Sequence, residues 1–509
     1  MEQPAPPQQQ PPQPKKPANQ FDGWLPLVVA TVVMLVAAWV SLSNRQEPAE
    51  AQAGIDAGLL LTEAWDLLAV DEQTTGTVIL GQDPTHLDPA RQKIEAALLL
   101  APEDAGIHTG LGSYRYTAGM LEPAIVSFNR AIALNPQDPI ALNNRGVVYH
   151  AMEQPARAIA DFDLAIAHNP NGIALNNRGV AYRTQGKLDL AIADYGQVIE
   201  QNPDDAAALN NRGHAYYTQG KLAQAIADYR QAIERNPEVG EVFTNLGAAY
   251  LALGRLEPAI ANFNQAIRLN PQDAMALSNR GFALWRQGKL APAIADFSQA
   301  MELAAQEAAR GRLVPAYRVQ GQLMLTIATG DPAITSSRQR AAIAANRGLA
   351  YQDLGNLELA IADFTLAIEL NPRDIDSFTN RGYSYAQQGM LDAALADLNR
   401  VVSLDPNDAG GFSNRGLVHS DLGNLAAAIA DHQHALALNP QYAHAYYNLA
   451  CVYSLQSQAA KALPNLRRAL EYDENGYLLE HSRTDPELDN IRGHAGFKQL
   501  MREFGRRVE

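Results

Sequence analysis

Arginine and aspartate recur in this sequence as pairs sixteen residues apart, at the spacing of an ion pair between two neighbouring helices. The arginines are Arg145, Arg178, Arg212, Arg280, Arg347, Arg381 and Arg415, and the aspartates are Asp161, Asp194, Asp228, Asp296, Asp363, Asp397 and Asp431. Where leucine replaces the arginine, as in Leu111, Leu246 and Leu449, the aspartate is replaced too, by Ser127, Asn262 and Asn465. This covariation predicts bidentate ion pairs. A row of arginines that binds an anionic ligand is the functional alternative.

Asparagine stands directly before each of these seven arginines, and before two of the leucines that replace them, and is the strongest candidate for binding chemistry. The series is Asn144, Asn177, Asn211, Asn245, Asn279, Asn346, Asn380, Asn414 and Asn448. A side-chain amide both donates and accepts hydrogen bonds, which suits it to hold a peptide backbone without reading side chains. The structural alternative is a ladder of asparagines bonded to neighbouring helices or to water.

Catalytic and metal-binding signatures are missing from the sequence. The eleven histidines are scattered, and the close pair His432/His434 would lie on different faces of a helix. Cys451 is the only cysteine and lies in an apolar helical segment, so we expect a buried, inert thiol. No phosphate-binding loop, dinucleotide fingerprint or nucleophile elbow is found. We therefore expect neither an enzyme nor a metal or cofactor site.

A unit of thirty-four residues, 206–239, shows which elements carry these residues. Apolar and small residues recur at helical spacing in two stretches, and Gly220 separates them. Pro237 ends the second stretch. The unit is predicted to be an antiparallel helical hairpin that must stack on neighbours to bury its apolar faces.

Six residues of this unit give it a family resemblance: Gly213, Tyr216, Ala225, Tyr229, Ala232 and Pro237. In type and spacing they resemble the tetratricopeptide repeat. Leu209 stands where the family often has tryptophan, and Arg212 where it usually has leucine. The resemblance implies an all-α fold, a right-handed superhelical solenoid of helix-turn-helix repeats. It also implies that the asparagines face a concave groove that binds a protein or extended peptide, with Tyr217, Phe282, Trp285 and Tyr383 as its aromatic lining.

The repeats divide the chain into segments. Copies begin at about residues 105, 139, 172, 206, 240 and 274 and, after an interruption, at 341, 375, 409 and 443. This gives a six-repeat array over 105–304 and a four-repeat array over 341–475. Region 305–340 is expected to be a degenerate repeat, with a loop between two arrays as the alternative. Residues 48–104 are an atypical leading helical unit, in which 71–87 is expected to be a loop.

The C-terminal segment 476–509 is expected to close the stack. Residues 482–501 resemble the tail that ends many bacterial tetratricopeptide arrays, in which an acidic-proline turn precedes a final helix. Terminal repeats need such a cap because one of their faces has no neighbour. The expected capping residues are Leu479, Leu488, Ile491, Phe497 and Leu500.

The N-terminal region carries a candidate membrane anchor. Residues 1–22 are rich in proline and glutamine and form an expected disordered tail, while 23–44 contain no charged residue. The apolar run 24–42 is long enough to span a bilayer, and a cleavable signal peptide is the alternative. Lys15 and Lys16 before the span and Arg45 after it place the N-terminus in the cytoplasm and the repeats on the extracytoplasmic side.

The net charge of −15 is spread along the repeats, which argues against nucleic acid as a partner. These observations predict a membrane-anchored, single-pass bacterial scaffold or adaptor that binds protein or peptide partners in its groove. The alternative is a structural spacer or a self-assembling component of an envelope complex.

Overall fold

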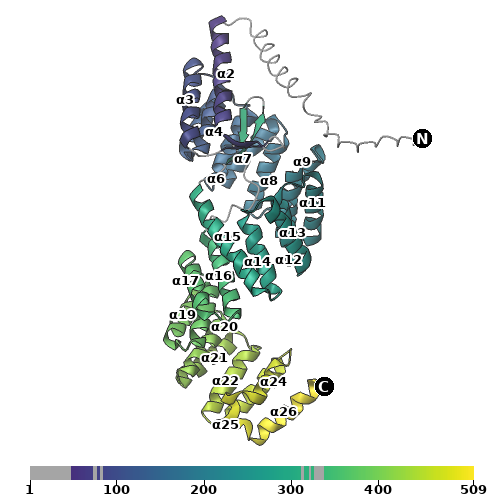
Figure 1. The fold of residues 1–509 in the computed structure, drawn as a ribbon, viewed down its shortest axis with the longest axis vertical. Helices are drawn as coiled ribbons and strands as arrows, with labels where there is room; N and C mark the ends of the chain where they lie inside the picture. The colour runs from purple at the N-terminus through teal and green to yellow at the C-terminus, as the bar shows by residue number, and fades with distance from the viewer. Residues whose placement is uncertain are drawn as a thin grey trace, which may run out of the picture. The chain divides into compact units, whose positions relative to one another are not determined.

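A computed structural model describes residues 48–72, 77–80, 84–310, 314–319, 322–325 and 337–508 (Figure 1). The predicted tail 1–22 and the predicted span 24–42 lie outside these residues. Among the residues described, none of the helices combines the length and the apolar character needed to cross a membrane. The chain divides into two compact units, which are treated separately below.

The first unit contains a leading hairpin, three regular hairpins and four strands. The leading helices are α2 (Pro48–Leu68) and α3 (Pro84–Leu100), and they pack against each other. The regular helices are α4 (Ala105–Thr117), α5 (Leu121–Leu134), α6 (Pro139–Ala151), α7 (Pro155–His168), α8 (Gly172–Thr184) and α9 (Leu188–Gln201).

The second unit contains seven regular hairpins and a C-terminal tail. Its first three hairpins are α10 (Ala206–Thr218) with α11 (Leu222–Arg235), α12 (Gly240–Ala252) with α13 (Leu256–Leu269), and α14 (Ala274–Arg286) with α15 (Leu290–Arg310). The next four are α16 (Ser337–Asp353) with α17 (Leu357–Leu370), α18 (Ile375–Gln387) with α19 (Leu391–Leu404), α20 (Ala409–Asp421) with α21 (Leu425–Leu438), and α22 (Ala443–Leu455) with α23 (Ala459–Tyr472). Nine of the ten first helices start at the predicted residue, and α16 starts four residues earlier.

Small residues let the two helices of a hairpin meet. A Cβ atom added at Gly213 would lie 2.8 Å from Cε1 of Tyr229, so only glycine fits beneath that ring. Ala225 and Ala232 are fully buried in the same interface. Gly220 adopts a φ of +74°, the left-handed conformation that ends α10 and turns the chain into α11.

Two segments contain strands, which the all-α prediction did not include. β1 (Ala69–Glu72) begins two residues before the expected loop 71–87, and β2 (Thr77–Leu80) lies within it. β3 (Val314–Val319) and β4 (Gln322–Leu325) lie within the expected degenerate repeat 305–340. The four form one antiparallel sheet in the order β1-β2-β3-β4. Both expectations were wrong because the pairing of Val78 with Ala316 joins segments far apart in sequence, which a local periodicity does not reveal.

The C-terminal tail closes the array. It consists of α24 (Tyr477–Thr484), the short 3₁₀ helix η1 (Pro486–Leu488), α25 (Asp489–Arg492) and α26 (Ala495–Val508). The five expected capping residues are at most 4 % exposed and lie in one cluster with α22 and α23; they are Leu479, Leu488, Ile491, Phe497 and Leu500. The tail thus covers the face of the last repeat that would otherwise have no neighbour.

Candidate functional site

The seven arginine–aspartate pairs are all formed between the two helices of one hairpin. In each, Nε and Nη2 of the arginine donate to the two carboxylate oxygens at 2.6–2.8 Å. The aspartate side chains are only 5–9 % exposed and the arginine side chains 16–23 %. Hydrogen bonding to the aspartate raises the arginine pKa, for example that of Arg212 beside Asp228.

The third nitrogen of most of these arginines, Nη1, reaches the second helix of the preceding repeat. Arg280 donates to Asn264 at 2.7 Å and Arg381 to Thr365 at 3.0 Å. Each such guanidinium therefore ties three helices together and is occupied by protein groups. This geometry disfavours the alternative of an arginine row for anionic ligands.

In the repeats that lack the arginine, the residue at the aspartate position hydrogen-bonds to the backbone of its own helix. Asn262 donates to the backbone oxygen of Pro258 at 2.8 Å, and Asn465 donates to that of Lys461 at the same distance. The neutral side chain is thus satisfied locally, which explains why both charges vanish together.

The nine asparagines of the series fall into three groups. Three members, Asn144, Asn177 and Asn211, are 0–2 % exposed. These three were expected to face a groove with spare hydrogen-bonding capacity, and that expectation was wrong because stacking of the repeats buries them. Asn144 donates to Ser113 at 3.1 Å and Asn177 to Asn143 at 2.9 Å, so these two are rungs of an internal ladder.

Two further asparagines also bond to the preceding first helix. Asn245 donates to Asn210 at 3.0 Å, and Asn448 donates to Ser413 at 3.4 Å. Both are partly buried. The structural alternative, a ladder between neighbouring helices, therefore describes these positions better than a binding role.

The remaining four asparagines differ. The side-chain amides of Asn279, Asn346, Asn380 and Asn414 are partly exposed and make no hydrogen bond within the described residues. The preceding repeats explain part of this. Ala345 offers Asn380 no side-chain acceptor. The residue equivalent to Ala345 is Thr244 for Asn279 and Thr379 for Asn414. Thr244 donates its hydroxyl to Asp273, and Thr379 donates its hydroxyl to the backbone oxygen of Ile375. The ladder is thus interrupted in four successive repeats.

An apolar side chain stands one helical turn after each of these asparagines. Tyr383 is 55 % and Leu417 39 % exposed, and Phe282 and Leu349 are partly buried. Residues three apart share a face of a helix, so each amide adjoins its apolar neighbour. We call the eight residues the asparagine–apolar strip: Asn279, Phe282, Asn346, Leu349, Asn380, Tyr383, Asn414 and Leu417.

The strip runs across three first helices that contact one another, α14, α16 and α18, and its last two residues lie on α20, the first helix of the next repeat. α14 contacts α16, and α16 contacts α18. Trp285 Nε1 donates to Asp353 at 2.7 Å and Gln352 Nε2 to Ser384 Oγ at 2.9 Å, which fixes these helices side by side. The ring of Trp285 lies 5.5 Å from that of Phe282, so this predicted groove aromatic adjoins the strip. Tyr217 lies apart from it on α10, with its ring 6.4 Å from that of His214.

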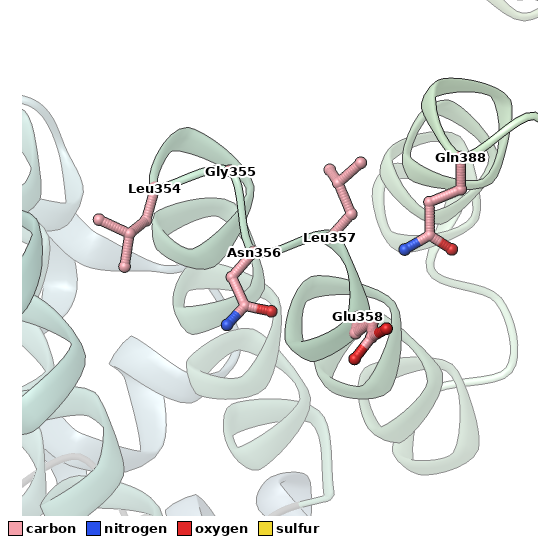
Figure 2. Close-up of a pocket in the computed structure, with 6 residues that line it drawn as sticks. All are labelled: Leu354, Gly355, Asn356, Leu357, Glu358 and Gln388. Atoms are coloured by element: carbon pink, nitrogen blue, oxygen red, sulfur yellow. The ribbon is translucent and has the colours of Figure 1, made fainter.

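Two other candidate sites are less suitable. A shallow depression at the α16–α17 turn is lined by Leu354, Asn356, Leu357, Glu358 and Gln388, but Figure 2 shows the two leucines pointing away from its polar groups. No convergent set of ligand groups forms there.

The other candidate is a buried cluster beneath the C-terminal tail. Ligand atoms of Cys451, Asp485 and Glu487 lie within 4.8 Å of one another. Burial raises the pKa of the Cys451 thiol and of the Glu487 carboxyl. Tyr447 donates to Asp485 at 2.6 Å, which ties the tail to α22. The cluster thus serves as a hydrogen-bonded anchor for the cap.

Family models for the tetratricopeptide repeat match residues 143–206, 176–240, 210–263, 341–374, 382–446 and 433–463, and models for the TPR repeat match 112–153 and 248–288. Together they cover more than half of the chain. The chain belongs to the tetratricopeptide-repeat (TPR) family. The resemblance drawn from the sequence is therefore confirmed, as is the solenoid of helix pairs.

Solved TPR structures match parts of this TPR chain. YrrB, described as a TPR protein with an unusual peptide-binding site, is 22 % identical over 43 % of this chain and 95 % of its own, with a TM-score of 0.32. PilF of Pseudomonas aeruginosa is 15 % identical over 48 % and 96 %, with a TM-score of 0.38. PilW, a type IV pilus biogenesis factor, is 19 % identical over 47 % and 94 %, with a TM-score of 0.38. No curated protein matches the chain.

Proposed function

We propose that this TPR protein is a non-catalytic scaffold that binds a partner protein through an extended segment laid along the asparagine–apolar strip. TPR proteins are protein-interaction modules, and this coarse role follows from the family. The observation that supports the strip is the set of four amides without a hydrogen-bonding partner in the described chain, each beside an apolar side chain on successive first helices. Such amides match the donors and acceptors of a peptide backbone.

The test is affinity capture from a native extract with the full chain. The variant carries Asn346→Ala, Asn380→Ala and Asn414→Ala, and the control carries Asn407→Ala, an exposed asparagine in the turn before α20. We expect the control to retain the partner and the triple variant to lose it. Equal capture of the partner by both variants would show that the strip does not bind it.

We also propose that residues 24–42 anchor the scaffold in a membrane, with the repeats on the extracytoplasmic side. The support is the uncharged apolar run and the position of Lys15, Lys16 and Arg45 around it. Carbonate extraction of membranes tests the anchor, and protease treatment of intact spheroplasts tests the orientation. Release of the chain by carbonate would contradict the anchor, and protection of the repeats would reverse the orientation.

A further inference from the structure

Three carboxylates border the asparagine–apolar strip. Asp353 of α16 and Asp421 of α20 each stand four residues after the strip leucine of their helix, and Asp376 of α18 stands four residues before the strip residue Asn380. Residues four apart share a face of a helix, so each carboxylate lies on the face that carries the strip. All three aspartates are exposed and open to a partner.

Asp353 adjoins the strip in space as well as in sequence. Its carboxylate accepts a hydrogen bond from the indole nitrogen of Trp285 at 2.7 Å, and the ring of Trp285 lies 5.5 Å from that of Phe282, a member of the strip. An indole is neutral, so this hydrogen bond leaves the negative charge of Asp353 uncompensated. The strip therefore has an anionic border at α16.

Asp421 lies where the strip meets the C-terminal tail. Although its side chain is exposed, nearby protein takes part of the carboxyl away from water and raises its pKa. In the tail, burial raises the pKa of Glu487 first, the charges of Asp485 and Asp421 raise it further, and His481 lowers it. Like charges disfavour ionisation of their neighbours, so negative potential accumulates at the α20 end of the strip.

The strip aspartates have no cationic partner within the described residues: none of the three forms an ion pair there. The arginines of the same helices are each held by an aspartate of their second helix; they are Arg347, Arg381 and Arg415. Arg286 takes the equivalent repeat position on α14, so the sign changes only at that end. From α16 to α20 the border of the strip is thus negative.

We propose that the segment bound by the strip is basic: an extended stretch of a partner protein that carries lysine or arginine beside its apolar residues. The inference rests on the proposed function and names the class of partner that the scaffold takes. The apolar side chains of such a segment bury against the strip, its backbone meets the asparagine amides, and its cations pair with Asp353, Asp376 and Asp421. An acidic segment would be repelled by the same carboxylates.

The probe is a library of random linear heptapeptides displayed on phage and selected on the purified full chain in detergent. We expect lysine and arginine to be enriched among the selected peptides relative to the starting library. A synthetic copy of the most enriched peptide is then titrated into the same protein. Its affinity should fall as the salt concentration rises, because salt screens exposed charges.

The strip variant carries Asp353→Asn, Asp376→Asn and Asp421→Asn. Asparagine keeps the size of the side chain and an acceptor for Trp285 while it removes the charge. We expect this variant to bind the selected peptide about tenfold more weakly, since each exposed ion pair contributes up to about 1 kcal/mol.

The matched control carries Glu358→Gln, Glu369→Gln and Asp392→Asn. It removes the same net charge from exposed carboxylates on the second helices α17 and α19, outside the strip. The affinity for the peptide should stay unchanged, which separates a local pairing from the general attraction of an acidic protein for basic peptides.

A charge reversal provides the complementary test. A chain with Asp353→Lys and Asp421→Lys should select peptides enriched in aspartate and glutamate. Selections on the wild-type chain without enrichment of lysine or arginine would overturn the inference. A peptide affinity that the strip variant leaves unchanged, or that the control lowers equally, would also overturn it.

The proposed function and this inference fail separately. If partner capture depends on the strip asparagines but is unaffected by the three aspartate substitutions, this inference fails and the scaffold function stands. If capture is independent of those asparagines, the proposed function fails by itself.

Discussion

At the residue scale, the repeated arginine–aspartate ion pair is largely buried. Asp228 is 5 % exposed and its two oxygens are held by Arg212. Removal of one partner leaves a largely buried charge without compensation, which costs far more than loss of an exposed pair. The covariation in the sequence thus has a direct energetic cause: a repeat keeps both charges or neither.

This argument predicts a non-additive mutational cycle. Arg212→Leu alone should destabilise the chain by about 2 kcal/mol or more, because Asp228 stays buried and unpaired. Adding Asp228→Asn should recover part of that loss, since it recreates the combination Leu246 with Asn262. Urea denaturation of the four proteins measures the coupling free energy. Strictly additive changes would contradict the pairing.

His432 is the second residue-scale feature with a measurable consequence. It replaces the aromatic ring that packs beneath glycine in other repeats, and it is fully buried against Gly416. Its Nε2 has no hydrogen-bond partner in the described part of the chain. Burial lowers the pKa of His432 to about 4, while Asp431 acts in the opposite direction.

The sign of the resulting pH dependence follows from linkage. A folded-state pKa below the ordinary value of 6.5 means that protonation favours the unfolded chain. Stability should be complete above pH 6.5 and fall as the pH drops towards 4, by at most about 3 kcal/mol. His432→Phe should remove this loss, and Phe364→His should add a second one. Melting curves between pH 7 and pH 4 provide the comparison, and identical acid profiles for wild type and His432→Phe would refute the assignment.

At the element scale, the turn inside each hairpin requires one residue with a positive φ, and two repeats have a residue other than glycine at that position. Eight hairpins place glycine there with φ between +70° and +79°, namely Gly119, Gly186, Gly220, Gly254, Gly288, Gly355, Gly389 and Gly423. Glu153 and Ser457 hold the same position with φ of 58° and 57°. A side chain in this left-handed conformation meets the following carbonyl, which costs free energy that glycine avoids.

Ser457→Gly should therefore stabilise the protein by about 0.5–1 kcal/mol, as the relief of strain exceeds the added entropy of the unfolded glycine. The reverse change at an equivalent turn, Gly423→Ser, is the matched control and should destabilise. Thermal melting of both variants measures the effect. A loss of stability in Ser457→Gly would show that the turn is not strained.

At the scale of the whole molecule, the sheet is the feature that local repeats do not explain. It joins the leading unit to the interruption between the arrays through the pair Val78 and Ala316. A chain with Val78→Cys and Ala316→Cys should form a disulfide on mild oxidation, because residues opposite each other in antiparallel strands lie within reach.

The control pairs Val78→Cys with Leu323→Cys, since Leu323 is opposite Arg318 rather than Val78. The native Cys451 is 1 % exposed and should contribute little background. Peptide mapping without reductant identifies the bond. Equal cross-linking in both chains would exclude the register.

The sequence by itself determined the repeats, their boundaries, the ion pairs and the capping leucines, because each follows from contacts repeated at a fixed local spacing. Gly213 and Tyr229, or Arg212 and Asp228, meet within one hairpin whatever lies further away. Only the tertiary structure decided which asparagines are buried, because Asn177 and Asn380 occupy the same position in near-identical repeats. The two also differ in their hydrogen bonding, because Asn143 offers an acceptor to Asn177, whereas Ala345 offers none to Asn380. The sheet was hidden for a related reason, since strand pairing over long sequence separations leaves no local period.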